Sequence, residues 1–290
     1  MSITIKDGFK VFGLNTAIES LALESDRIPE YMDYFQENNF EILFISSFHG
    51  YNNGDIDFLK NYPFVKGVYV YSNDIDFSGI YYLPDLEFII LSVERNIGVD
   101  FGKLRTLRNL TFSWCKMDSG LESCENLEEL HIRNYTPKSA DLTGLPEFQN
   151  LRCLELIKSN IKSLSGISKF RLLQKLELSY LSKLEDVSGF SSELVIEELL
   201  FSKCKRIKNH MAVVSLKRLR RLAYNDCGEI ESIDFINDLP AIQDFRFVGT
   251  NVLDGDMSPC LRLKNVGFTG KKHFSHSPGQ VSSIIANQPK

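Results

Sequence analysis

The chain has 290 residues, of which 43% are hydrophobic and 24% are charged. It is too apolar for a disordered protein and long enough for one large domain or two ordinary ones. The net charge of −5 is unevenly spread. Residues 1–100 carry 6 Lys/Arg against 16 Asp/Glu, a net of −10, and residues 101–290 carry 27 against 22, a net of +5. This asymmetry suggests oriented docking on a partner.

The six cysteines lie at positions 115, 124, 153, 204, 227 and 260, without a C-x-x-C pair. In a chain of this length, that spacing argues against a disulfide scaffold and against a zinc module. The first residues lack a basic region followed by an apolar run, and no window approaches the roughly 18 apolar residues of a membrane span. We therefore expect a soluble, cytoplasmic protein with free thiols.

Taken in chain order, residues 1–17 are expected to form an N-terminal cap, and 29–39 is the best candidate for a regular helix. From residue 18 to about 270 the pattern L-x-x-L-x-L recurs, which indicates a solenoid of 11 to 12 short coils. The mean spacing of the repeats is about 22 residues. Residues 271–290 are expected to be a C-terminal tail or cap. The first apolar residues of the units are Ile18, Phe40, Val65, Leu86, Leu107, Leu127, Leu151, Leu173, Ile196, Leu219, Ile242 and Leu263.

The pattern of each unit predicts one short strand. Its fourth and sixth residues, such as Leu154 and Leu156, point to one face because strand side chains alternate, and one strand cannot bury that face alone. We therefore predict an α/β solenoid, a curved horseshoe with a parallel sheet on its concave face and short 3-10 or extended segments on its convex face. The strands should be centred near 43–45, 68–70, 89–91, 110–112, 130–132, 154–156, 176–178, 199–201, 222–224, 245–247 and 266–268.

Segment 151–190, LRCLELIKSNIKSLSGISKFRLLQKLELSYLSKLEDVSGF, resembles the repeats of bacterial internalin-type leucine-rich-repeat proteins. The resemblance covers about residues 18–270. It implies the solenoid fold and a protein-binding scaffold, and it says little about the partner.

The ninth position of a unit is usually Asn or Cys in such repeats. Here it is Asn73, Cys115, Cys204 and Cys227 in four units, and we expect the three cysteines to be buried there. Other units have residues such as Ser159, Leu181 and Thr250, so the polar ladder should be interrupted. Cys153 falls at a solvent-facing strand position and should be the most accessible thiol.

The concave face is the predicted partner-binding surface, since its strand residues alternate with the buried ones. An apolar and aromatic zone is followed by a charged, mixed zone. Exposed aromatic patches usually mark interfaces, although a capping segment could instead bury the N-terminal aromatics. The candidate residues are Phe44, Tyr69, Tyr71, Phe88, Ile90, Trp114, His131, Arg133, Glu155, Glu177, Tyr180 and Arg246.

Other motifs are weaker. His273 and His276 have the spacing of a metal pair, but no third ligand lies near them in sequence, so we expect no metal. The basic stretch 203–221 could attract phosphate, but its residues should be divided among several faces, which argues against nucleic acid. There is no P-loop, G-x-G-x-x-G, H-E-x-x-H or G-x-S-x-G motif, so we predict neither an enzyme nor a cofactor.

We therefore expect a non-enzymatic intracellular protein-binding module, monomeric and without a membrane role, whose partner is a protein with a basic surface. Within this class, a bacterial immunity or inhibitor protein that covers a toxin is our first hypothesis. The alternatives are an injected or secreted effector that acts on host proteins, and a nucleic-acid-binding regulator that uses residues 203–221.

Overall fold

The structure, a computed structural model, describes residues 3–14, 18–92 and 97–287. Parts of the expected cap and tail, namely residues 1–2, 15–17 and 288–290, lie outside the described residues. The chain forms two compact units, Met1–Leu130 and His131–Lys290, which we call the first and second units.

The first unit begins with three antiparallel strands, and from the third strand onward it continues as a parallel sheet in chain order. Its strands are β1 (Ile3–Lys6), β2 (Phe9–Leu14), β3 (Ile18–Ala22), β4 (Ile42–Ile45), β5 (Gly67–Val70), β6 (Phe88–Leu91), β7 (Asn109–Ser113) and the start of β8 (Glu129–Arg133). Helix α1 spans Ile28–Glu37, and 3-10 helices span Ser25–Arg27, Ser47–His49, Asp57–Asn61, Ser78–Tyr82, Phe101–Lys103 and Leu121–Ser123.

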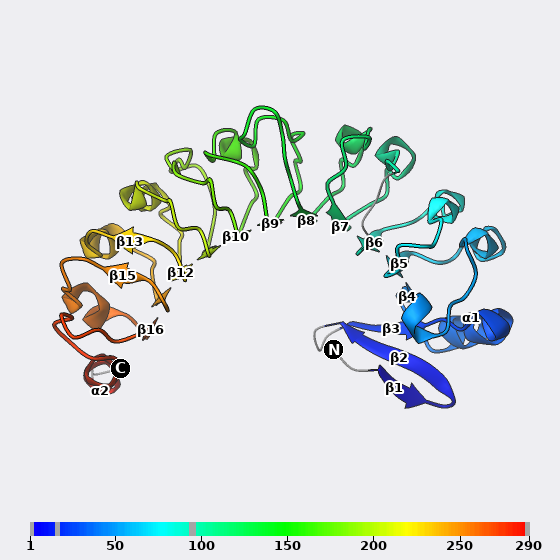
Figure 1. Cartoon of the computed structure of the whole chain (residues 1–290), viewed down its shortest axis with the longest axis horizontal. Coiled ribbons are helices and arrows are strands. Elements are labelled where there is room, and N and C mark those ends of the chain that lie inside the picture. Colours follow the sequence, from blue (N-terminus) through cyan, green and yellow to red (C-terminus); the bar gives the residue numbers. More distant parts are fainter. Residues whose placement is uncertain (1–2, 15–17, 93–96, 288–290) are drawn as a thin grey trace. The chain divides into compact units, whose positions relative to one another are not determined.

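The second unit repeats the arrangement with parallel strands β9 (Cys153–Ile157), β10 (Lys175–Ser179), β11 (Glu198–Ser202), β12 (Arg221–Asn225), β14 (Asp244–Phe247) and β16 (Asn265–Phe268). Strands β13 (Glu229–Ile230) and β15 (Asn251–Val252) form a separate parallel pair. Helix α2 spans Pro278–Ala286, and 3-10 helices span Ile167–Lys169, His210–Ser215, Asp234–Asp238 and Ser258–Arg262. In each unit the strands of the repeats line one side, and the 3-10 helices lie on the other (Figure 1).

One constant register joins the repeats. Leu154 pairs with Leu176, and Leu176 with Leu199, and all three side chains are buried. The residues between the inward leucines, such as Glu155 and Glu177, therefore lie on the opposite, solvent-facing side, which we call the strand face. All eleven predicted strands are present, and the predicted leucine-rich-repeat solenoid is confirmed in each unit.

In the described residues there are two α-helices: α1 connects β3 to β4, and α2 follows the last repeat strand. Helix α1 confirms the prediction for residues 29–39; Pro29 lies in its first turn, and Tyr31 and Phe35 are buried. The tail contains α2, which begins with a capping box formed by Ser277 and Gln280 and packs on β16. Among the described residues, no helix has the length and apolar character needed to cross a bilayer.

The ninth-position ladder extends further than predicted. The Ser159 hydroxyl donates to the Tyr135 carbonyl at 2.6 Å, and the Thr250 hydroxyl donates to the Tyr224 carbonyl at the same distance. The Cys204 thiol contacts the Leu178 carbonyl at 3.3 Å in the same way. A hydroxyl therefore replaces the usual amide or thiol, because each of these groups can satisfy a buried backbone carbonyl.

The prediction of three buried ninth-position cysteines is right for Cys204 and Cys227 and wrong for Cys115, which is only half-buried. The chain turns at Cys115, whose amide donates to the Asp118 carboxylate at 2.9 Å, so this residue lies closer to the surface. All six thiols are free.

We expect truncation of the inward leucines to destabilise the fold. Leu154→Ala and Leu176→Ala should each lower the free energy of unfolding by about 2–5 kcal/mol, because each leaves a cavity in a continuous core. Urea denaturation would measure the change, with Lys162→Ala on the exposed surface as the control. Near-wild-type curves for both leucine variants would contradict the register.

Thiol labelling should separate two groups of cysteines. Burial raises the pKa of Cys204 to about 11 and that of Cys227 to about 12, so little reactive thiolate forms at either site. Iodoacetamide at mildly alkaline pH should therefore modify Cys115 and Cys153 first, as mass spectrometry of the native protein would show. Rapid labelling of Cys204 in the folded state would contradict this packing.

Candidate partner-binding site

Part of the predicted aromatic surface is buried. Phe44 in β4 and Tyr69 in β5 are only 1% and 8% exposed, so the prediction that they stand open on the strand face is wrong. Phe88 and Ile90 in β6 are half-buried, and they pack against the hydrophobic cluster that contains Phe44 and Tyr69.

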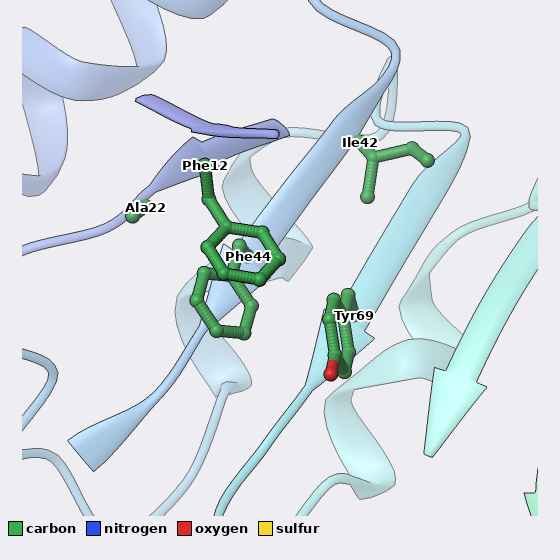
Figure 2. Close-up of a cluster of buried hydrophobic side chains, with 5 residues drawn as sticks. All are labelled: Phe12, Ala22, Ile42, Phe44 and Tyr69. Atoms are coloured by element: carbon green, nitrogen blue, oxygen red, sulfur yellow. The ribbon is translucent and has the colours of Figure 1, made fainter. Parts of the chain in front are cut away.

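The N-terminal hairpin explains this burial. In Figure 2, the Phe12 ring lies against the Phe44 ring, and Tyr69 stands beside them. The Phe12 and Phe44 centroids are 4.4 Å apart, and those of Phe44 and Tyr69 are 4.6 Å apart. Ala22 of β3 pairs with Phe44 and is small enough to leave room for the stacked rings, while Ile42 completes the cluster. The hairpin thus closes a small core on the strand face.

Aromatic side chains remain open where the strands of the first unit end. Tyr71 follows β5 and is 43% exposed; Phe48 follows β4 and is 76% exposed, and their ring centroids are 5.8 Å apart. Trp114 follows β7 and is half-buried, with its ring 6.4 Å from that of Phe112. We call Phe48, Tyr71 and Trp114 the aromatic edge. The carboxyl ends of parallel strands lie at the same edge of a sheet, so the three residues lie along one border.

Phe48 was not among the predicted site residues. It occupies a ninth position, where a small polar residue normally faces the core, and a phenylalanine there cannot provide the hydrogen bond. The chain instead forms the 3-10 helix Ser47–His49 and turns the ring outward. The mismatch between residue type and position is the sequence signal that could have identified it.

A cleft of about 450 Å³ lies near the opposite edge, where the strands of the first unit begin. Phe64 and Phe88 contribute apolar surface, and Lys66, Glu87 and Arg108 line it with charge. Glu87 accepts from Lys66 at 3.0 Å and lies 3.8 Å from Arg108. The complete lining is Phe35, Phe40, Glu41, Ile42, Phe64, Lys66, Glu87, Phe88, Arg108 and Asn109. The site prediction included only Phe88. Ile42 and Asn109 occupy the equivalent strand position in their repeats, and the other seven lining residues lie outside the strands.

The strand face of the second unit is charged and mixed, as predicted, but many of its charges are paired. His131 contacts Glu155 at 2.7 Å, and Lys175 contacts Glu177 at 2.5 Å. The hydrogen bond with His131 lowers the pKa of Glu155 although burial opposes the shift. These pairs neutralise much of the charge that a partner would otherwise meet.

Arg246 belongs to a second group of paired charges. Its guanidinium makes two hydrogen bonds to the Asp244 carboxylate, at 2.9 and 3.1 Å, and these raise the pKa of Arg246. Arg221 contacts the same carboxylate at 3.4 Å and Glu198 at 3.4 Å. Asp244, which the sequence analysis did not select, is buried and fixes both arginines.

Arg133 and Tyr180 are exposed at the carboxyl end of the strands of the second unit. Tyr180 directly follows β10, and its hydroxyl accepts a hydrogen bond from Lys203 at 3.2 Å. The structure thus brings the predicted residues into two places: the strand face and the border where the strands end.

The basic stretch 203–221 is divided, as the sequence analysis expected. Lys208 contacts Glu185 at 2.9 Å, Arg206 contacts the same glutamate at 3.7 Å, and Arg220 contacts Glu197 at 3.6 Å. These residues lie in different parts of the coil, and their carboxylate partners reduce the local positive charge.

The two histidines with the spacing of a metal pair form hydrogen bonds with neighbouring protein atoms. His273 contacts the Val252 carbonyl at 2.9 Å, and His276 contacts the Ser275 hydroxyl at 3.0 Å. In the described part of the chain, no group of three or more His, Cys, Asp or Glu residues could hold a metal ion.

Comparison with known proteins agrees with this architecture. A family model described as "At1g61320/AtMIF1, LRR domain" matches residues 145–288. None of the curated protein sequences matches the chain.

Many solved structures are similar to the chain, including the following three. The functional domain of InlJ from Listeria monocytogenes has 14% identity and a TM-score of 0.57, with 92% of this chain and 56% of that one covered. An internalin (inlF) from the same species has 20% identity and a TM-score of 0.41, covering 69% and 54%. A leucine-rich-repeat protein of Leptospira interrogans has 14% identity and a TM-score of 0.29, covering 81% and 73%.

The chain spans little more than half the length of the two internalin structures. At this identity the likeness to InlJ concerns the fold alone, and the fold agrees with the constant strand register described above. Residues 145–288 thus match a leucine-rich-repeat domain, and the solenoid fold of the chain is similar to that of InlJ.

Proposed function

We propose that the chain is a non-enzymatic protein-interaction module that contacts its partner with the aromatic edge of the first unit. The observation that carries this proposal is the pair formed by Phe48 and Tyr71, two large rings that lie side by side in solvent. Isolated apolar residues on a surface need no explanation, but an adjacent aromatic pair favours an interface. Such rings lose little conformational entropy on docking and dominate binding energies.

The charge of the first unit indicates the chemistry of the partner. Met1–Leu130 contains 10 lysines and arginines against 21 aspartates and glutamates, a net charge of −11. Exposed carboxylates at Asp55, Asp74 and Asp76 lie in the segments that follow β4 and β5, as do the two rings. An acidic surface of this kind would steer a basic partner toward the aromatic edge, and salt would slow the association.

We further propose that the protein acts as a monomer in the cytoplasm of a bacterium, as an immunity or inhibitor protein that covers a toxin. Six free thiols in the folded chain are in keeping with a reducing compartment. An effector that acts on host proteins remains the alternative within the class of protein-binding modules. The division and pairing of the 203–221 cations make a nucleic-acid regulator the weaker candidate.

Affinity capture would test the proposal before the partner is known. Tagged wild-type protein and a Phe48→Ala, Tyr71→Ala double variant would be incubated with extract of the native cells, and bound proteins quantified by mass spectrometry. A basic protein retained by the wild type and lost by the double variant would support the proposal. Equal retention by both would contradict the assignment of the aromatic edge.

With the partner in hand, Tyr71→Ala and Trp114→Ala should each weaken binding by about 2 kcal/mol or more, since each removes a rigid ring from the contact. Calorimetric titration would measure the affinity. The effect on the Tyr71 variant should come with an almost unchanged melting temperature, because that ring lies at the surface, outside the buried core.

Lys162→Ala serves as the control, because Lys162 is exposed in a connection of the second unit. This variant should leave the binding affinity and the melting temperature unchanged. Normal binding by both aromatic variants would show that the partner contacts another surface.

A further inference from the structure

In the second unit, six successive repeats have a residue with a left-handed backbone conformation at their eighth position, which lies just beyond the repeat strand. This position is occupied by Asn134, Lys158, Tyr180, Lys203, Asp226 and Gly249, with φ between 49° and 71°. The amides of the first five donate to a carbonyl of the next repeat, for example Lys158 to Ser179 at 2.9 Å, Tyr180 to Ser202 at 2.8 Å, and Lys203 to Asn225 at 2.8 Å. The Gly249 amide donates instead to the Thr269 hydroxyl at 3.2 Å. Equivalent residues therefore stand in a row.

Three successive members of this row are unfavourable choices for the backbone. Glycine, asparagine and aspartate tolerate the left-handed region, and they occupy the outer members of the row. The left-handed conformation is unfavourable for Lys158, Tyr180 and Lys203, and all three side chains are exposed. Core packing therefore does not explain why a bulky ring and two long cations stand there.

These three residues occupy equivalent positions in successive repeats, and we call them the Lys-Tyr-Lys ridge. The Lys203 ammonium lies 4.8 Å from the centroid of the Tyr180 ring and donates to its hydroxyl at 3.2 Å. Tyr180 is 47% exposed. Lys183 and Lys205 are exposed in the turns just beyond Tyr180 and Lys203.

The positive charge of the ridge is only slightly compensated. Among the ion pairs formed by described residues, none involves Lys158, Lys183 or Lys205. Asp226, the next member of the row, acts electrostatically on Lys203 and ends the cationic part of the ridge.

We propose that the Lys-Tyr-Lys ridge is a second binding surface, which takes an acidic peptide segment of a partner protein. Carboxylates of the segment would contact Lys158 and Lys203, and an apolar or aromatic side chain would pack on Tyr180. This inference goes beyond the proposed function, because it concerns the other unit and a partner surface of opposite charge.

A peptide fits the ridge better than a nucleic acid. A nucleic-acid strand is held by stacking on several successive aromatic rings and by many phosphate contacts. The described ridge has one exposed ring, and the row turns acidic at Asp226 one repeat beyond Lys203. A short acidic segment needs only the two cations and the single ring.

Asparagine substitutions give a direct test, because Asn134 shows that asparagine fits this backbone position. The probe is a fluorescein-labelled acidic heptapeptide, EEDFDEE, and fluorescence anisotropy at low ionic strength measures its binding to the full chain. Lys158→Asn with Lys203→Asn, and Tyr180→Asn alone, should each weaken peptide binding by about tenfold or more. Their melting temperatures should equal or exceed that of the wild type, since asparagine relieves the backbone.

A matched control is Lys217→Asn with Arg218→Asn, which removes the same charge from the exposed segment before β12 and should leave peptide binding nearly unchanged. No peptide binding by the wild type, or equal losses in the ridge and control variants, would overturn the proposal. A lowered melting temperature in the ridge variants would overturn it too, since the residues would then be structural. Tighter, ridge-dependent binding of a labelled oligouridine would replace the peptide with a nucleic acid.

Discussion

The constant register between neighbouring repeat strands determines the rest of this structure. Leu154, Leu176 and Leu199 pair in sequence, so their side chains bury one another in a core that no single strand could form. The same register also aligns all the remaining strand positions. Residues that face solvent therefore form rows, and the chemistry of each surface depends on which residue types recur along its row.

At the N-terminus, a different interaction interrupts this rule. The β1–β2 hairpin brings Phe12 onto Phe44, and the rings that the alternation assigns to solvent become part of a small second core. Apolar surface on the strand face is thus used for stability there. Beyond the strand ends, Phe48 and Tyr71 stay exposed and can meet a partner. The second unit meets solvent mainly with paired charges, such as Arg246 with Asp244, and with the ridge around Tyr180.

Periodicity alone predicts most of the fold. The spacing of Leu151 and Leu173, for example, predicts strands β9 and β10 and the burial of their leucines, since alternation and repeat length leave few arrangements. The site was less predictable for physical reasons. Burial of Phe44 depends on a segment outside the repeat, and no local pattern shows which face that segment covers. The exposure of Phe48 and the pairing of Asp244 depend on loop geometry and on contacts between repeats.

The contact between Phe12 and Phe44 separates the buried aromatic cluster from the exposed aromatic edge. A double-mutant cycle on the free energy of unfolding, with Phe12→Ala, Phe44→Ala and the double variant, measures that contact most directly. Stacked rings 4.4 Å apart should show a coupling energy of about 0.5–1.5 kcal/mol. Strictly additive effects would contradict the account, since Phe44 would then be open on the strand face and available to a partner.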